Sequence, residues 1–146
     1  MRKVVALACV LAVSGSSVMA QQGDPIRQRQ ALMKNNQDQL RTLTAMARGQ
    51  SAFDTAVVQR ALQTVEQNAQ RIPALFTPNS FQGETNALPV ILEQKADFDA
   101  RAMKLGQDAR AAQTRIRDQA SLQAEIQAIG QNCGGCHQTY RKRMPQ

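Results

Sequence analysis

Apolar side chains recur along this chain at spacings of three, four and seven residues, which places them on one side of an α-helix. Four segments show this spacing, and residues that favour turns separate them. The low aromatic content of 3% and the many Ala, Gln and Leu residues also favour helices. The sequence therefore predicts an all-α protein with four helices. Their apolar stripes are Ile26, Met33, Leu40, Leu43 and Ala47; Phe53, Val57, Ala61, Val65, Ala69 and Ile72; Ile91, Phe98, Ala102, Leu105 and Ala109; and Leu122, Ile126, Ile129, Cys133, Cys136 and Tyr140.

Residues with strong preferences for helix ends set the limits of the first two helices. The first opens at Asp24-Pro25, a capping residue followed by proline at the first helical position, and Gly49 closes it. The second opens at Ser51, with Asp54 three residues later as in a capping box. Pro73 stops this helix, because proline lacks the N–H group that a helix interior needs.

A connecting segment separates this first pair of helices from the second pair. Residues 73–87 are rich in Pro, Asn, Ser and Gly and predict a long loop, which indicates a crossing or a functional cover. The third helix is expected from about Leu88-Pro89 to about Gln113, and the fourth from near Asp118. Because short connections make successive helices antiparallel, the predicted fold is an up-down-up-down four-helix bundle.

The fourth helix carries the most informative motif, Cys133-Gly134-Gly135-Cys136-His137. Two cysteines separated by two residues and followed by histidine form the attachment pattern of a c-type haem. On one helical turn both thiols reach the vinyl groups of one porphyrin, and the imidazole is an axial ligand of the iron. His137 is the only histidine of the chain, so no other imidazole competes. The predicted cofactor is one covalently bound haem c.

Two other interpretations of the motif are half of a zinc site and a redox-active disulfide. A structural zinc site normally has four Cys or His ligands, and only three such residues lie close together here. A thioredoxin-like motif lies beside a βαβ pattern, and the sequence shows none. Both interpretations are weaker than covalent haem.

The N-terminus predicts export. Two basic residues precede an apolar run over residues 4–13, and small residues then lead to Ala20. This arrangement is typical of a bacterial signal peptide cleaved after Ala20. The run is too short for a membrane anchor, which takes about 20 residues. Residues 1–20 are expected to be removed, and residues 21–146 to form one haem domain in the periplasm, since bacteria attach this cofactor outside the cytoplasm.

The net charge of the mature chain indicates which classes of molecule it can bind. Removing Arg2 and Lys3 from the 18 basic residues leaves 16 against 11 acidic residues, a net formal charge of +5. Two haem propionates would lower this to about +3. Such a charge favours acidic protein partners or anionic surfaces. Nucleic acid is disfavoured, because the chain has one Tyr, no Trp and scattered basic residues.

The predicted topology suggests a second axial ligand. In an antiparallel bundle the C-terminal end of the fourth helix, with His137, lies beside the N-terminal end of the first helix. Met33 lies about two turns into that helix on its apolar stripe, so it faces the haem from the distal side. Met46 lies roughly 20 Å further along the axis, and Met103 lies above the expected haem level. Methionine on such a stripe can also be an ordinary core residue, so both interpretations of Met33 stay open on spacing alone.

Residues from about Asp24 to Lys142 resemble the class II cytochromes c, the family of cytochrome c′ and cytochrome c556. The resemblance rests on the C-terminal haem motif followed by Tyr140-Arg141, and on the stretch Arg29-Gln30-Ala31-Leu32-Met33-Lys34. The C-terminal placement of the motif and the spacing of Arg29 and Met33 select class II. The connecting segment also matches, at Leu75, Phe76, Pro78, Ser80, Gly83, Thr85, Ala87 and Pro89.

The resemblance implies roles for three residues outside the motif. Family members with an apolar residue at the position of Met33 have five-coordinate iron, and those with methionine are six-coordinate and low-spin, so Met33 implies the c556 type. Arg29 is implied to pair with a haem propionate, with a solvated arginine as the alternative. Arg141 is implied to lie beside the proximal histidine, with a surface cation at a helix C-terminus as the alternative.

The expected function is a soluble one-electron carrier without enzymatic activity, because Met/His ligation leaves no open position and raises the reduction potential. Its redox partner proteins would have acidic docking surfaces, steered by the cations Arg141-Lys142-Arg143. The alternative is a five-coordinate cytochrome c′-type protein that binds NO or CO. A peroxidase is the weakest hypothesis, because the only histidine is already used and no distal acid is evident. The family also implies homodimers, with the first two helices as an interface.

Overall fold

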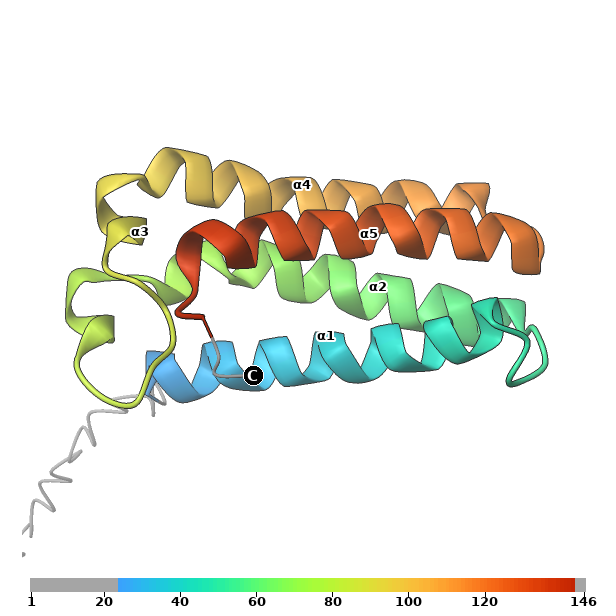
Figure 1. The fold of residues 1–146 in the computed structure, drawn as a ribbon, viewed down its shortest axis with the longest axis horizontal. Coiled ribbons are helices and arrows are strands. Elements are labelled where there is room, and N and C mark those ends of the chain that lie inside the picture. Colours follow the sequence, from blue (N-terminus) through green and yellow to red (C-terminus); the bar gives the residue numbers. More distant parts are fainter. Residues whose placement is uncertain (1–23, 144–146) are drawn as a thin grey trace, which may run out of the picture.

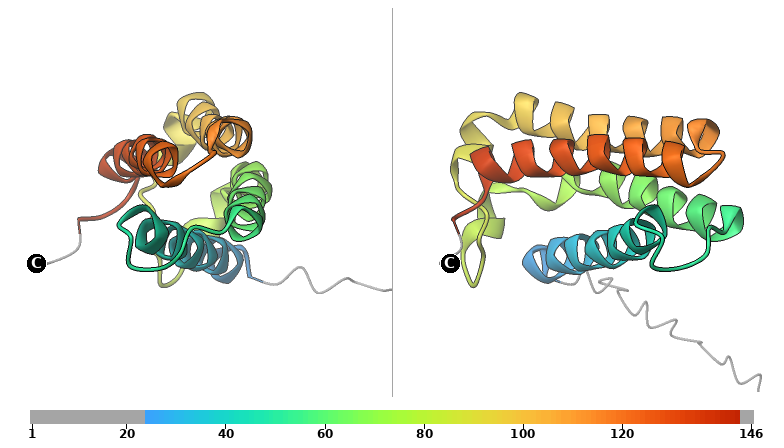
Figure 2. Two further views of the ribbon diagram at one scale, coloured as in Figure 1. Left: turned by 90° about the vertical axis from the view of Figure 1, so that its right-hand side faces the viewer. Right: turned by 45° about the vertical axis from the view of Figure 1, so that its right-hand side comes forward.

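Four long helices arranged alternately up and down dominate the structure, a computed structural model that describes residues 24–143. Each long helix packs against its neighbours in the order α1, α2, α4, α5 and back to α1 (Figures 1 and 2). The predicted four-helix bundle is therefore confirmed. The predicted signal peptide lies outside the described residues. The helices are α1 (Pro25–Ala47), α2 (Thr55–Arg71), α3 (Val90–Glu93), α4 (Lys95–Arg115) and α5 (Gln119–Tyr140).

α1 begins and ends where the sequence predicts. The carboxylate of Asp24 accepts a hydrogen bond from the backbone N–H of Ile26 at 2.9 Å, and Pro25 takes the first helical position. Gly49 has a φ of +69°, a left-handed conformation that glycine adopts without strain. The chain can therefore turn sharply after α1 and enter α2 from the same end of the bundle.

The predicted start of α2 is wrong by three residues. Asp54, not Ser51, is the capping residue, and its Oδ1 accepts hydrogen bonds from the N–H groups of Ala56 at 2.8 Å and Val57 at 3.0 Å. A carboxylate at this position satisfies two free N–H groups and interacts favourably with the positive end of the helix dipole. The spacing of the capping-box pattern had placed Asp54 inside the helix.

The third predicted helix is divided in the structure. α3 ends at Glu93, and Gln94 leaves helical geometry with a ψ of 35° before α4 begins at Lys95. The Tyr140 hydroxyl oxygen lies 3.1 Å from Gln94 Oε1, so this break packs against the end of α5. No proline or glycine marks Gln94 in the sequence. The break therefore accompanies a tertiary contact rather than a local preference, and the sequence prediction missed it.

The segment between α2 and α3 covers one end of the bundle (Figure 1). It pairs with the residues that follow the Cys-X-X-Cys-His motif, through an isolated antiparallel bridge between Ala87 and Arg141. The N–H of Lys142 also donates to the carbonyl of Asn86 at 2.7 Å. The predicted loop is thus fixed to the C-terminal end of α5. It contains two short 3₁₀ helices, Pro73–Leu75 and Pro78–Phe81.

The buried apolar side chains form two clusters along the bundle. We call the first the closed cluster: Leu43, Met46, Ala47, Val58, Ala61, Leu62, Val65, Ala69, Leu105, Ala109, Ala112, Ile116, Leu122 and Ile129. We call the second the cavity cluster: Leu32, Ile72, Phe76, Ile91, Phe98, Ala102 and Tyr140. Among residues 24–143, no helix has the length and apolar character needed to span a bilayer.

Candidate haem site

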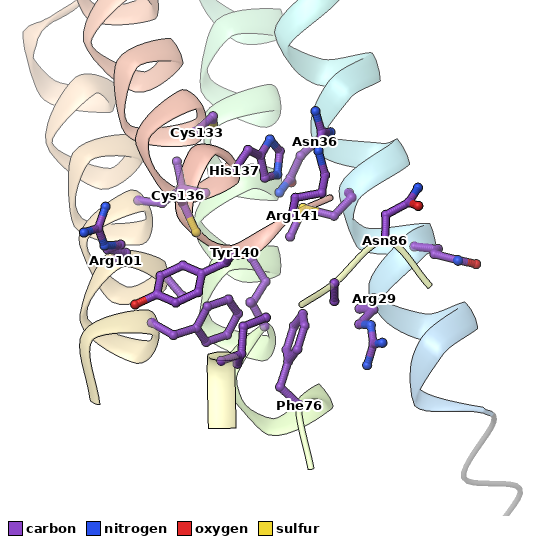
Figure 3. A pocket seen from close by; sticks show the side chains of 18 of the residues that line it. Arg29, Asn36, Phe76, Asn86, Arg101, Cys133, Cys136, His137, Tyr140 and Arg141 are labelled. Carbon is purple, nitrogen blue, oxygen red and sulfur yellow. The ribbon is translucent and has the colours of Figure 1, made fainter. Parts of the chain in front are cut away.

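A cavity of about 480 Å³ lies between α1 and α5, at the end of the bundle that the loop covers (Figure 3). Its volume falls within the range of about 300–1,000 Å³ that is typical of small-molecule sites. Most of its wall is apolar, which favours a hydrophobic ligand over a hydrated ion. The apolar wall includes Leu40, Ile72, Phe76, Ile91, Phe98, Ala102 and Leu105.

The predicted haem motif lines this cavity from the last turns of α5. The helix continues without a break through Gly134 and Gly135, so Cys133 and Cys136 lie one turn apart on the same side. Both thiols are free, and burial raises the pKa of each. They therefore stay protonated at neutral pH and face an apolar space.

His137 faces the same cavity from the position next to Cys136 (Figure 3). Burial lowers the pKa of the imidazole, and the positive charge of Arg141 lowers it further. Both effects disfavour the imidazolium form, because it would add a charge in a partly buried site beside another cation. The side chain is thus held in the neutral form that binds a metal.

This set of donors fits a covalently attached haem. Two free thiols one helical turn apart, a neutral imidazole beside them and an apolar cavity match the chemistry of thioether attachment and axial ligation. Over residues 24–143, no group of three or more His, Cys, Asp or Glu side chains is arranged to hold a metal ion. The zinc interpretation gains no support from that part of the chain.

Met33 lines the cavity from α1, on the wall opposite α5. It is partly buried and packs against the cavity cluster. The N-terminal part of α1 therefore lies beside the C-terminal part of α5, which confirms the expected placement of these helix ends. Met46 is buried in the closed cluster, and Met103 is 44% exposed on α4, so neither reaches the cavity.

Arg29 is only 4% exposed, so the alternative of a solvated arginine is wrong. Its guanidinium donates to the carbonyl of Leu75 at 3.2 Å, to Oγ of Ser80 at 3.0 Å, to the carbonyl of Ser80 at 2.8 Å and to Oγ1 of Thr85 at 2.8 Å. It also lies 4.6 Å from the ring centroid of Phe76. Arg29 thus binds the covering loop to α1, one helical turn before Met33.

Arg141 lies at the exposed end of α5 and also lines the cavity. Its backbone N–H donates to the carbonyl of His137 at 3.2 Å. The structure therefore places it next to His137 and also at a helix C-terminus, where a cation interacts favourably with the dipole. The two interpretations from the sequence describe one and the same position. Lys142 and Arg143 follow it and are exposed as well.

A polar network beside Cys136 did not emerge from the sequence. The Tyr140 hydroxyl donates to Oδ2 of Asp97 at 2.5 Å, and Nε of Arg101 donates to the same oxygen at 2.7 Å. Both bonds lower the pKa of Asp97. Arg101 lines the cavity and reaches the carbonyl of Gly135 at 3.4 Å. The partners are far apart in sequence, so no local pattern signals them.

A second residue that the sequence prediction missed is Asn36, which lines the cavity on α1 and is 6% exposed. A signal for it was present in the sequence. Arg29, Asn36 and Leu43 repeat every seven residues, and all three are buried. Two polar residues in such a repeat mark a helix face that meets something other than a purely apolar core.

Comparison with known proteins identifies relatives over nearly all of the described chain. The family model described as Cytochrome C′ matches residues 24–141. A cytochrome c′ of Rhodopseudomonas palustris is 41% identical over 134 residues, which cover 91% of this chain and 92% of the relative. A cytochrome c-556 of the same species is 34% identical over 149 residues, which cover 98% of this chain and 99% of the relative.

Comparison with solved structures also identifies cytochrome c′ as a relative. The structure superposes on the solved cytochrome c′ of Rhodopseudomonas palustris with a TM-score of 0.81 at 41% identity, over 85% of this chain and 100% of that chain. The match spans the whole bundle, and the cavity with its motif matches the chemistry of covalent haem. The chain therefore belongs to the cytochrome c′ family and carries one covalently attached haem c.

Proposed function

We propose that this protein is an exported one-electron carrier whose iron has two protein ligands, His137 from α5 and Met33 from α1. Cys133 and Cys136 would hold the haem through thioether bonds. The observation that carries this proposal is that Met33 and His137 line the same cavity from two helices that face each other. Of the three methionines in residues 24–143, Met33 is the one that lines it.

The chain's own residues suit simple electron exchange. When bound, the haem supplies an iron that takes up and releases one electron. The neutral imidazole of His137 and the thioether of Met33 are both uncharged ligands, so neither needs to gain or lose a proton as the electron moves. The mostly apolar walls favour contact with the haem ring over contact with water. Met/His ligation also raises the reduction potential, and it leaves no position open for enzymatic chemistry.

Two arginines complete the proposed site. We assign Arg29 to a haem propionate, because its guanidinium is buried at the cavity wall and would bring a positive charge to that anion. Its bonds to Ser80 and Thr85 hold it there. Arg141 lies beside His137, where its charge favours the neutral imidazole. These placements support the roles that the family resemblance implies for both residues.

The proposed partners are acidic redox proteins of the periplasm. Arg141 lines the cavity, and the three consecutive cations Arg141, Lys142 and Arg143 are all exposed and form a positive surface. Such a surface speeds association with an acidic partner at low ionic strength. Electron-transfer rates should therefore fall as salt is added, and a flat salt dependence would count against this surface. A homodimer through α1 and α2 remains part of the proposal.

A second candidate function is binding of NO or CO at an open iron, as in a five-coordinate cytochrome c′. It is favoured by the identity of 41% to the cytochrome c′ of Rhodopseudomonas palustris, against 34% to the cytochrome c-556 of that species. In this case Met33 would be a core residue rather than a ligand. The two candidate functions differ in whether Met33 binds the iron.

The substitution Met33→Leu separates the two candidates. If Met33 is a ligand, the ferric protein should change from low-spin to high-spin and the ferrous protein should gain rapid CO binding. The matched control is Met46→Leu, because Met46 is a buried methionine of the same helix that lies in the closed cluster. It should leave both spectra unchanged. Unchanged spectra in Met33→Leu would remove Met33 from the iron and favour the gas-binding function.

A further inference from the structure

The distal wall of the cavity holds one buried amide, Asn36. This residue lies on α1 three positions after Met33 and is 6% exposed. Residues three apart in a helix lie on the same side, so Asn36 and Met33 line the cavity together. Figure 3 shows the Asn36 side chain extending from α1 toward the space in front of His137. Asn36 is thus a buried amide between the two apolar residues that α1 supplies to this wall, Met33 and Leu40, while the other lining residues of α1 are polar.

Asn68 fixes the orientation of this amide. Nδ2 of Asn68, on α2, donates to Oδ1 of Asn36 at 2.8 Å and to Oδ1 of Asn35 at 2.8 Å. These two bonds use both hydrogens of the Asn68 amide group. Asn68 is itself 7% exposed, so the pair is buried. The oxygen of Asn36 is therefore held toward α2, and its NH₂ group is left for another acceptor.

The NH₂ group of Asn36 has no acceptor among residues 24–143. Among these residues no fully buried side-chain nitrogen or oxygen lacks a hydrogen-bond partner, so this NH₂ group is accessible from outside the protein atoms, where an acceptor can reach it. Asn36 lines the cavity together with Met33 and His137, so the cavity offers that access. The missing acceptor is therefore expected in the cavity, on its distal side.

We propose that Asn36 determines which small ligands the distal side of the haem accepts whenever that position is open, and that it favours an anion over neutral CO. Its amide donates a hydrogen bond to a bound anion such as azide, and the apolar surroundings strengthen this bond. CO accepts hydrogen bonds poorly and gains little. The inference rests on the proposed placement of the haem at Cys133 and Cys136. It does not depend on whether Met33 is a ligand in the native protein.

The test compares azide and CO affinities of the haem-loaded protein in a Met33→Ala background, which opens the distal position. Azide is titrated into the ferric form and CO into the ferrous form, and both are followed in the Soret band. Adding Asn36→Leu should weaken azide binding at least about tenfold and change CO affinity less than about twofold. Leucine has nearly the shape of asparagine, so packing is preserved. Asn68→Leu, which frees Asn36 from its orientation, should cause a smaller loss of azide affinity.

The matched control is Asn35→Leu in the same background. Asn35 also accepts a hydrogen bond from Asn68, but it is exposed and does not line the cavity. The azide affinity of the Asn35→Leu variant should therefore equal that of the parent. Equal azide affinities with Asn36 and with Asn36→Leu, or no azide binding in the parent, would overturn the inference. A denaturing gel stained for haem is run on the parent protein before any titration. Absence of covalent haem on that gel would contradict the proposed function, and this result is distinguishable from a failure of the Asn36 inference alone.

Discussion

The two ends of this bundle are built from different residues. The closed cluster is aliphatic, rich in alanine, and contains side chains such as Leu43, Leu62 and Leu122 that are 0% exposed. The other end surrounds the cavity, and four of the five aromatic residues of the chain belong to it or pack against it. Those four are Phe76, Phe81, Phe98 and Tyr140, and their rings contact one another in tilted or edge-to-face pairs.

The closed end supplies most of the stability of this molecule, and the cavity end carries the functional site. Small and aliphatic side chains let the helices of the closed end approach closely and fill the space between them. Large aromatic side chains, a divided helix and a long loop instead line a space that protein atoms do not fill. Because the same four helices run through both ends, the closed end can hold the cavity end in shape. Substitutions in the two ends should therefore have separable effects.

The largest expected effect belongs to the cavity end and concerns haem retention. The double substitution of Cys133→Ala and Cys136→Ala should abolish covalent attachment, since no other thiol among residues 24–143 lines the cavity. The measurement is haem staining of the purified protein after a denaturing gel. Gly134→Ala is the control, because a Cβ at this position meets no atom within 4 Å. Haem that stays bound through the gel in the double variant would contradict the assignment.

The next effect belongs to the closed end and concerns stability. Leu62→Ala should lower the free energy of unfolding by about 2–5 kcal/mol, through lost burial and a residual cavity. The haem spectrum should stay as in the native protein. Denaturant titration followed by circular dichroism measures the first quantity, and absorption measures the second. Leu92→Ala, at a position that is 36% exposed, should cost much less. A changed spectrum in Leu62→Ala would show that the two ends are not separable.

A smaller effect is expected where the loop meets α1. Arg29→Lys should lower stability by about 2 kcal/mol, because an ammonium group cannot replace the four hydrogen bonds that the guanidinium makes. Hydrogen exchange should rise over residues 75–85 and stay unchanged in the closed cluster. Arg27→Lys is the control, since the side chain of Arg27 is 87% exposed. Uniform exchange rates in Arg29→Lys would mean that Arg29 does not hold the loop.

The smallest effect tests the cap of α2. Asp54→Ala should cost about 1 kcal/mol, because two N–H groups lose their acceptor. Ser51→Ala should change stability by less than about 0.5 kcal/mol, since an exposed side chain that does not cap contributes little. Thermal unfolding of both variants measures the difference. If Ser51→Ala cost as much as Asp54→Ala, the cap assigned by the sequence pattern would be the better one.

The sequence predicts the fold well because helices in a bundle repeat at a fixed period. The steps of four and three from Leu122 to Tyr140 place Cys133 and Cys136 on the inner side of α5, as the structure has them. The antiparallel packing of α1 against α5 follows from short connections between the helices. It places the N-terminal part of α1 beside the C-terminal part of α5, so Met33 and His137 line the same cavity. These features need only local periodicity and chain connectivity.

The features that the sequence does not predict depend on contacts between distant segments. The break at Gln94 is joined to Tyr140, 46 residues later in the chain. The burial of Arg29 depends on the covering loop, in which the carbonyl of Leu75, 46 residues later in the chain, accepts one of its hydrogen bonds. The orientation of Asn36 depends on Asn68 in another helix. Polar partners of this kind have no fixed spacing, so a single sequence shows the residue but not its role.

The most direct test of the central claim, that Met33 and His137 both bind the iron, is a spectrum of the native holoprotein. Absorption and EPR spectra are recorded for the ferric form, and CO is added to the ferrous form. Ligation by both residues predicts a low-spin ferric iron with a methionine-to-iron charge-transfer band and no rapid CO binding. A high-spin ferric iron with prompt CO binding would contradict it and would leave Met33 as a core residue of an open site.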